Sequence, residues 1–390
     1  MNIGKKINNL LPPRVDKTAQ IGEGVKIKRG ARVGKNAVIE NGAVIKKGAV
    51  VEDGAVIKKG AVVGEEAKIS RGTTIGKKSK VCRKAQVGRN VKVGDRATIS
   101  EEAVVEDNVK MGKYAKVGVK SRVNANAVME MSAQIGDSAQ VEEGTVFHED
   151  AYLGDGGQIG RESSVGERTF IWKNTKIGNN VTIKDSNTEI FSDVNIGDHA
   201  TIGENVTIFN GASVGKGSKV HRGATIGRNA EVGDYVEISQ EAGINKNTVI
   251  ERQTQVGPRV KVGAGSVVQS GSDIGEGTEL EKGVVVGKGS WIRKDVHLAQ
   301  GVELGAYTKL RKGVEIGENT KMGSWGQIDS GAKIGKEVKI GESVYIEEGV
   351  AVGDNAEICD RANIRAGKVI EKDGRVDEAA TRRGWRPPRT

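Results

Sequence analysis

The stretch "GAVIKKGAVVEDGAVIKKGAVV", residues 42–63, places an aliphatic residue at every sixth position. An amphipathic helix would return its apolar residues every 3.6 positions and a half-buried strand every second position, so neither element alone explains a period of six. A repeating unit made of one short strand and one corner does explain it. We therefore expect a chain of six-residue units, here called hexads, that stack on one another.

The same period extends through most of the chain. Steps of six from Val15 to Ile183, and again from Ile190 to Ile370, meet only Ile, Val, Leu, Met or Phe, at 60 positions in all. The frame slips by one residue within "IKDSNTEIF", residues 183–191. The fifth residue of a hexad is usually small and shares a strand face with the next hexad's first residue, so both are predicted to point inward. The fourth residue, often Gly, Asn or Asp, falls at the corner, where positive φ suits these residue types.

The pattern [Ile/Val/Leu]-[Gly/Glu/Asp]-x-x-[Ala/Ser/Thr/Val]-x resembles that of the hexapeptide-repeat family and covers residues 15–370. The resemblance implies an all-β fold: a single-stranded, left-handed parallel β-helix, which is a triangular solenoid with three hexads per coil. Sixty hexads then make about 20 uninterrupted coils, and strands about 4.8 Å apart would give a length of about 95 Å. The left hand comes from the resemblance, because it runs against the usual right-handed crossover.

The rest of the sequence divides into two end segments. Residues 1–14 are expected to form an N-terminal cap, since stacked coils expose strand edges at their ends. Residues 371–390 are expected to form a C-terminal cap and a basic tail, which is a candidate for docking on nucleic acid, an acidic membrane or an acidic protein surface. The predicted docking residues of the tail are Arg382, Arg383, Trp385, Arg386 and Arg389.

Composition limits the alternatives further. The 390 residues include 56 glycines and only 3% aromatics, and their formal net charge is +10. Acids and bases alternate along the repeats, which favours a solvated surface of mixed charge over a polyanion groove. The two cysteines, Cys82 and Cys359, are too few for a disulfide framework. With no apolar stretch for a signal peptide or a membrane span, a cytoplasmic location is the default, although incorporation into a particle or appendage stays open.

The chemistry of the hexapeptide family was tested on the residues of this chain. Family members include acyltransferases, which use a loop ejected from a coil and a histidine base, and carbonic anhydrases, which use three zinc-binding histidines. No interruption long enough for such a loop is present, and the four histidines do not have a spacing that stacks them. We expect no catalytic residue, no metal site and no cofactor. His199 and His221 are the weak candidates for a base if the chain is an acyltransferase, in which case coenzyme A would be the cofactor.

Outward-facing residues provide the candidate contact surfaces. With three hexads per coil and the slip allowed for, five aromatic residues fall on one outer face, and such a contiguous apolar patch is typical of a contact surface. They are Tyr152, Phe170, Trp172, Phe191 and Phe209. A second ladder, Val249, Val267 and Val285, has one member per coil on another face. The alternative for both is ordinary stacking and β-propensity on a solvated surface.

The unbroken register favours a non-enzymatic structural rod or scaffold that docks partners or copies of itself through exposed faces and ends. Such a chain is expected to be a homo-oligomer or a component of a larger protein assembly. Two alternatives remain open. One is a hexapeptide-family acyltransferase that uses an acyl-coenzyme A or acyl-carrier donor and a sugar or amine acceptor. The other is a nucleic-acid-associated protein that binds through its basic ends.

Overall fold

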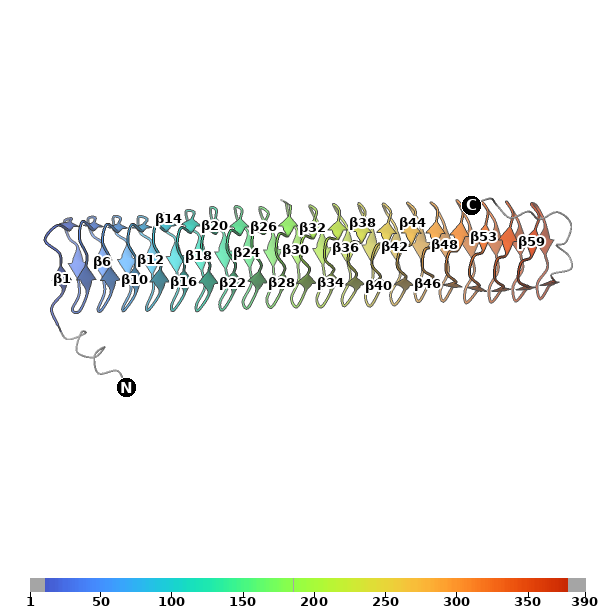
Figure 1. The fold of residues 1–390 in the computed structure, drawn as a ribbon, viewed down its shortest axis with the longest axis horizontal. Coiled ribbons are helices and arrows are strands. Elements are labelled where there is room, and N and C mark those ends of the chain that lie inside the picture. The colour runs from blue at the N-terminus through green and yellow to red at the C-terminus, as the bar shows by residue number, and fades with distance from the viewer. Residues whose placement is uncertain (1–10, 185, 378–390) are drawn as a thin grey trace, which may run out of the picture. The chain divides into compact units, whose positions relative to one another are not determined.

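The computed structural model describes residues 11–184 and 186–377. The chain divides into two compact units, Met1–Asp193 and Val194–Thr390. The described residues form only strands and turns, and no helix occurs among them. Each unit is a stack of short strands joined by tight corners (Figure 1).

Every strand is two residues long and comprises the last residue of one hexad and the first residue of the next. In the first unit, strands begin at every sixth residue from β1 (Arg14–Val15) to β29 (Thr182–Ile183), and β30 (Glu189–Ile190) follows after the slip. In the second unit the same step of six runs from β31 (Asn195–Ile196) to β61 (Arg375–Val376).

Strands pair in parallel with the strand three places further along the chain, so each unit has three sheets. In the first unit, β1 pairs with β4 (Arg32–Val33) in sheet A, β2 (Gln20–Ile21) with β5 (Val38–Ile39) in sheet B, and β3 (Lys26–Ile27) with β6 (Val44–Ile45) in sheet C. One turn therefore comprises three hexads. This confirms the predicted parallel β-solenoid with three sheets, the architecture of a left-handed β-helix. With three strands per turn, each unit contains about ten turns.

The core is formed by the first and fifth residues of each hexad, as the sequence predicts. Ile39 is 1% exposed, Ile57 is 0% exposed, and the small Ala43 and Ala55 beside them are fully buried. Burial of a side chain as large as isoleucine contributes roughly 1.5–3 kcal/mol. Most polar residues at the fifth position are hydrogen-bonded. Thr73 Oγ1, for example, donates to the carbonyl of Gly88 (2.5 Å) and accepts from the amide of Val91 (3.2 Å), whereas Thr169 Oγ1 has no partner.

From Gly24 onward, the fourth residue of each hexad adopts the positive φ that the corner requires. Gly54 (φ 64°) and Asn36 (φ 53°) match the residue types expected there, whereas Lys78 (φ 56°) and Trp325 (φ 64°) do not. A positive φ costs a residue with a side chain about 1–2 kcal/mol. A repeated hydrogen bond offsets this cost, because the corner amide donates to a carbonyl on the preceding turn, as from Lys78 to Lys59 (3.0 Å).

The slip lies at one corner of the first unit, between β29 and β30. Ser186 (φ 82°) and Asn187 (φ 51°) both have positive φ there, and Phe170 pairs with Glu189, one place later than a turn of three hexads would give. The extra residue is therefore absorbed in the corner, and Ile190 keeps its inward place at 0% exposure.

The ends of the repeat differ in how far the structure describes them. Most of the N-terminal cap expected over 1–14 lies outside the described residues, and so does the basic tail. The C-terminal cap expected from residue 371 begins with a further strand, β61, which pairs with β58 (Glu357–Ile358). The repeat thus extends one hexad beyond Ile370.

Candidate functional site

Four of the five predicted aromatic residues lie together on sheet C of the first unit. Tyr152 begins β24 (Tyr152–Leu153) and Phe170 begins β27 (Phe170–Ile171), with ring centroids 6.4 Å apart. Trp172 follows β27 and Phe191 follows β30, and their rings stack at 6.3 Å with an interplanar angle of 17°. These four residues, here called the aromatic face, form two parallel ladders of side chains.

The aromatic face is open to solvent although its members pack on one another. Phe170 is 45% exposed and Trp172 is 42% exposed. Tyr152 is less open, and its partial burial, together with the carboxylates of Asp155 and Asp137, raises the pKa of its phenol. Phe209, the fifth predicted residue, belongs to the second unit, where it follows β33 (Thr207–Ile208) and is 37% exposed. Whether these residues bind a partner stays a prediction.

The valine ladder forms as expected on sheet A of the second unit. Val249 in β40 (Val249–Ile250) pairs with Val267 in β43 (Val267–Val268), which pairs with Val285 in β46 (Val285–Val286). Each of the three side chains is half-buried, and Glu231 and Glu303 flank the ladder on the neighbouring strands. Its role as a contact surface stays a prediction.

The two histidines proposed as weak base candidates differ in their surroundings. His199 sits at a corner with φ 60°, and its side chain has no hydrogen bond or ion pair to any described residue. His221 follows β35 (Lys219–Val220), and its Nε2 lies 2.8 Å from Glu237 Oε1. A base is most effective when a neighbour orients its ring, so of the two His221 has the better setting.

His148, which the sequence analysis passed over, has a more complete set of polar neighbours. It follows β23 (Val146–Phe147) on sheet B of the first unit, with its Nδ1 3.3 Å from Glu130 Oε2. Its Nε2 lies 3.2 Å from the hydroxyl of Ser164, which begins β26 (Ser164–Val165). With the proton on Nδ1, the imidazole donates to Glu130 and accepts from Ser164. The sequence signal was available, since Glu130 and His148 are separated by three hexads and therefore stack on adjacent coils.

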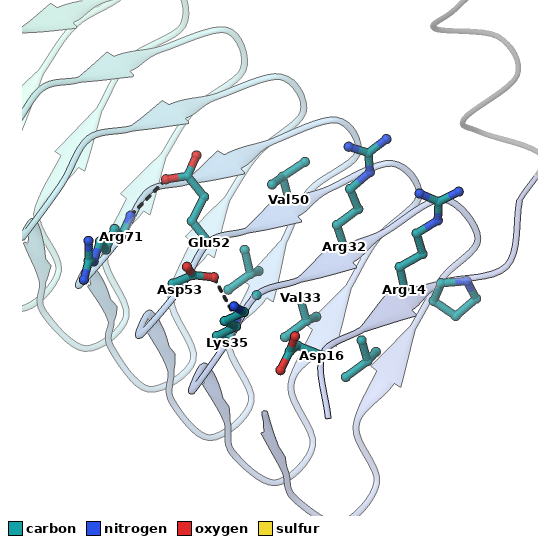
Figure 2. Close-up of a pocket in the computed structure, with 13 residues that line it drawn as sticks. Arg14, Asp16, Arg32, Val33, Lys35, Val50, Glu52, Asp53 and Arg71 are labelled. Atoms are coloured by element: carbon teal, nitrogen blue, oxygen red, sulfur yellow. Dashed lines mark hydrogen bonds between the residues drawn. The ribbon is translucent and has the colours of Figure 1, made fainter. Parts of the chain in front are cut away.

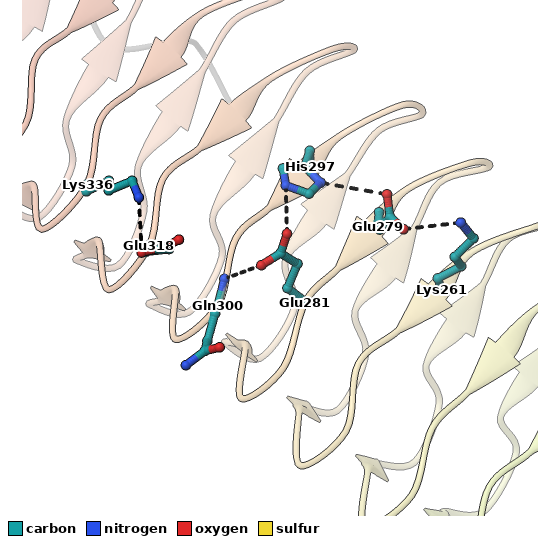
Figure 3. A network of polar contacts seen from close by, with 7 residues as sticks. All are labelled: Lys261, Glu279, Glu281, His297, Gln300, Glu318 and Lys336. Atoms are coloured by element: carbon teal, nitrogen blue, oxygen red, sulfur yellow. Dashed lines mark hydrogen bonds and ion pairs between the residues drawn. The ribbon is translucent and has the colours of Figure 1, made fainter.

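His297 lies in a denser network of charges on sheet C of the second unit. It begins β48 (His297–Leu298), with Nε2 3.2 Å from Glu281 and Nδ1 3.8 Å from Glu279 (Figure 3). Glu279 also pairs with Lys261 at 3.2 Å, and Glu281 accepts from the amide of Gln300 at 2.9 Å. These contacts leave both carboxylates engaged by the protein itself. Across the described residues, no group of three or more His, Cys, Asp or Glu side chains could hold a metal ion.

The first turns of the first unit carry a hollow of about 750 Å³ on sheet A (Figure 2). Arg14, Arg32 and Val50 stand on successive strands there, and Glu52 accepts from the amide of Arg71 at 3.2 Å. Asp53 accepts from the amide of Lys35 at 2.8 Å. Charges of both signs alternate across the hollow, so it favours no ligand of one sign.

One predicted feature, the basic tail, cannot be compared with the structure. The tail residues Arg382, Arg383, Trp385, Arg386 and Arg389 lie outside the described residues. In the part of the chain that is described, no helix is both long enough and apolar enough to cross a membrane.

Comparison with known proteins agrees with the repeat. A family model for the hexapeptide repeat of succinyl-transferase matches residues 193–228 and 331–360, and one for the GMPPB C-terminal domain matches residues 12–106. This is a hexapeptide-repeat chain. No curated protein matches it.

Solved structures similar to this hexapeptide-repeat chain are described as acyltransferases. The acetyltransferase domain of PglB from Neisseria gonorrhoeae is 26% identical, with 32% of this chain and 54% of that chain covered and a TM-score of 0.20. PerB from Caulobacter crescentus, in complex with CoA and GDP-perosamine, is 20% identical, with 29% and 54% covered and a TM-score of 0.20. The UDP-N-acetylglucosamine acyltransferase of Francisella novicida is 18% identical, with 46% and 63% covered and a TM-score of 0.18. The chain thus spans about half the length of the first structures that it matches.

Proposed function

We propose that this chain is a repeat scaffold that docks a second copy of itself through the aromatic face. The observation that carries the proposal is the open position of Phe170 and Trp172, each of which is more than two-fifths exposed. Aromatics are scarce in this chain, and four of them gather on one sheet of one unit. Large aromatic side chains at the centre of a contact commonly contribute about 2 kcal/mol or more each.

The packing within the aromatic face supports the same proposal. Trp172 stacks on Phe191, and Tyr152 packs against Phe170, so each ring is already held by a neighbour before any copy arrives. Association then freezes little additional side-chain motion, and less of the contact energy is lost to ordering. A two-fold interface would place the same four rings on both copies, as an isologous contact requires.

The test is the oligomeric state of a double variant, Trp172→Ala with Phe191→Ala. We expect native mass measurement and cross-linking to show loss of the assembly, while the circular dichroism of the coils stays unchanged because both rings lie outside the core. Tyr114→Ala is the matched control, since Tyr114 is 42% exposed in the same unit but stands at the corner before β18 (Lys116–Val117), two strands from β24 on sheet C. A wild-type chain that is monomeric, or a double variant that assembles like the wild type, contradicts the proposal.

A second candidate function, acyl transfer, is favoured by the array of Glu130, His148 and Ser164. The similarity of this chain to the hexapeptide repeat of succinyl-transferase supports the same chemistry. His148 Nε2 would take the proton from an acceptor hydroxyl or amine as that group attacks the carbonyl of an acyl thioester. A new bond forms between the acceptor and the acyl carbon, the carbon–sulfur bond breaks, and the thiolate leaves with the proton from the imidazolium. Glu130 would orient the ring and stabilise its cation.

This second candidate is tested by thiol release from an acyl-coenzyme A in the presence of amino-sugar acceptors. We expect His148→Gln to lower the rate about 100-fold, in line with the usual contribution of a general base. His199→Ala, in which an unbonded corner histidine is removed, is the matched control and should leave the rate unchanged. No thiol release above the solvent rate, or equal loss in both variants, rules out His148 as the base, and neither result bears on self-docking.

A further inference from the structure

Sheet B of the second unit carries a concentration of positive charge around one exposed tryptophan. Trp291 begins β47 (Trp291–Ile292) and is 50% exposed. It borders a hollow of about 500 Å³ whose lining includes Arg293, Lys294, Arg311 and Lys312. The arginines and the lysines form two adjacent columns, because Arg311 and Lys312 follow Arg293 and Lys294 by one full turn of three hexads.

Most of these cations lack an acidic partner. Some lysines of the unit do pair with a glutamate on the neighbouring turn, as Lys321 does with Glu303 at 2.9 Å and Lys333 with Glu315 at 3.1 Å. Among the described residues, by contrast, Arg293, Lys294, Lys309 and Lys312 have no ion-pair partner. Their charge is therefore available to an anion from outside the chain.

The carboxylate of Asp329, beside Arg311, is already engaged by its own neighbours. Asp329 accepts a hydrogen bond from Tyr345 Oη at 2.5 Å and another from Gln327 Nε2 at 2.9 Å, and only a long contact of 3.9 Å joins it to Arg311. Asp273, which pairs in register with Trp291, is the one acid among the residues that line the hollow. Positive charge thus dominates the hollow.

The cations and the indole are close enough to act on one ligand. The guanidinium of Arg293 lies 5.8 Å from the centroid of the Trp291 ring, and the ammonium of Lys309 lies 5.5 Å from it. An anion held between these two groups would therefore sit beside the indole. A ligand that joins an anionic group to a planar ring fits this arrangement better than an anion alone.

A second aromatic element lies at the corner that leads into the same sheet. Tyr307 and Trp325 stack at 4.3 Å with an interplanar angle of 19°, and Trp325 is 63% exposed. Tyr307 covers Gly289, two residues before Trp291, so closely that a Cβ atom on Gly289 would lie 2.7 Å from its ring. The stacked pair therefore extends the aromatic surface along the turns on which the basic columns stand.

We propose that this surface, here called the Trp291 surface, binds single-stranded nucleic acid. It comprises Trp291, Arg293, Lys294, Tyr307, Lys309, Arg311, Lys312 and Trp325. Unpaired bases would stack on the indole and on the aromatic pair, and the phosphates would lie along the basic columns, the combination that single-strand binders use. A duplex fits less well, because its bases already stack on one another and offer no free face to Trp291.

The test is fluorescence anisotropy of a labelled 12-nucleotide thymidine strand with the full-length protein. Loss of one stacking partner commonly weakens single-strand binding about tenfold, so Trp291→Ala should raise Kd by about that factor and Trp291→Phe by much less. Arg293→Ala with Arg311→Ala should lower the slope of log K against log salt by about 1.4, since each phosphate contact contributes about 0.7. The matched control is Lys92→Ala with Lys110→Ala, a pair of adjacent exposed lysines on sheet B of the first unit.

Two further probes distinguish base stacking from simple charge attraction. Heparin, a polyanion without bases, and a 12-base-pair duplex should both bind more weakly than the single strand. If either binds as tightly, if Trp291→Ala leaves Kd unchanged, or if the control pair loses as much affinity as the arginine pair, the proposal is overturned. Absence of binding by the wild-type protein also overturns it. Thermal unfolding of each variant verifies that the coils are intact, which is expected because all the altered side chains are outward-facing.

Discussion

At the residue scale, the division between inward and outward side chains could be read from the sequence, because it depends on a period of six that repeats locally. The inward places of Ile39 and Ile190, on either side of the slip, follow from that count alone. The polar contacts of His148 and Tyr345 did not follow from the period of six, because they join residues on neighbouring turns. To predict them, outward-facing residues one turn apart must be compared for polar pairs as well as for aromatic pairs.

Because its hydroxyl donates a hydrogen bond to Asp329, the phenol of Tyr345 is predicted to titrate at a higher pH than an ordinary tyrosine. The bond to the carboxylate is the main cause, and burial and the negative charge of Asp329 add to it, which together raise the pKa of Tyr345 from 10.0 to about 12. Since the folded value lies above the unfolded one, the stability from this bond is complete below pH 10 and is lost as the pH rises from 10 to 12. The difference in tyrosinate absorbance between wild type and Tyr345→Phe isolates this one residue.

The control for that titration is Asp329→Asn, which removes the charge and keeps a similar shape. The pKa of Tyr345 should then return toward its ordinary value, and the loss of stability between pH 10 and 12 should disappear. A tyrosine that titrates at the same pH in both proteins would contradict the bond as the cause.

At the scale of the element, the strands and corners followed from the sequence more completely than the contacts between turns did. The fourth residue was expected at the corner, and positive φ is observed there in residues as different as Asn36 and Trp325. The frequent glycine at the second position had no explanation at the sequence level. The structure supplies one, since a Cβ atom on Gly215 would lie 2.4 Å from the carbonyl carbon of Gly233 on the next turn.

Substitution of two glycines of the second unit should therefore change the free energy of unfolding in opposite directions. Gly215→Ala forces adjacent turns apart and should lower the free energy of unfolding by about 1–3 kcal/mol, as overpacking commonly does. A Cβ atom on Gly243 would meet no atom within 4 Å, and Gly243→Thr places a β-branched residue beside Thr225 on a strand, so it should raise stability by about 0.5–1 kcal/mol. Guanidinium unfolding measures both changes, and a Gly215→Ala variant as stable as Gly243→Thr would contradict the close approach of the turns.

At the scale of the whole molecule, the average charge of the sequence did not predict where positive charges gather on the surface. Acids and bases balance over the repeats, which predicted a mixed surface, and the paired lysines of the second unit agree with that expectation. The cations near Trp291 depart from it, because sequence averaging hides which charges lie next to one another on successive turns. Arg293 and Arg311 are neighbours because one turn comprises three hexads, which the family resemblance implied and the pairing of strands confirms.

The same turn length predicts how the molecule tolerates deletions. The full-turn deletion, which removes 231–248, takes out β37 (Glu231–Val232), β38 (Glu237–Ile238) and β39 (Gly243–Ile244). The remaining strands keep their sheets and their inward residues, so the variant should fold, with a denaturant m-value reduced in proportion to the surface lost. The short deletion, which removes 232–248, leaves one surplus residue. The corner between β29 and β30 contains one extra residue, so this fold can accommodate such a surplus.

The long deletion, which removes 230–248, is the opposite case and should be far more damaging. It leaves a corner one residue short, and the shortage cannot be absorbed by a bulge, so the following strands must shift by one place. Such a shift turns Ile250 outward and Val249 inward, and repeats the exchange at each strand that follows. Guanidinium unfolding followed by circular dichroism should therefore rank the full-turn deletion most stable, the short deletion next and the long deletion last. A long deletion as stable as the full-turn deletion would mean that the turns do not hold a fixed register.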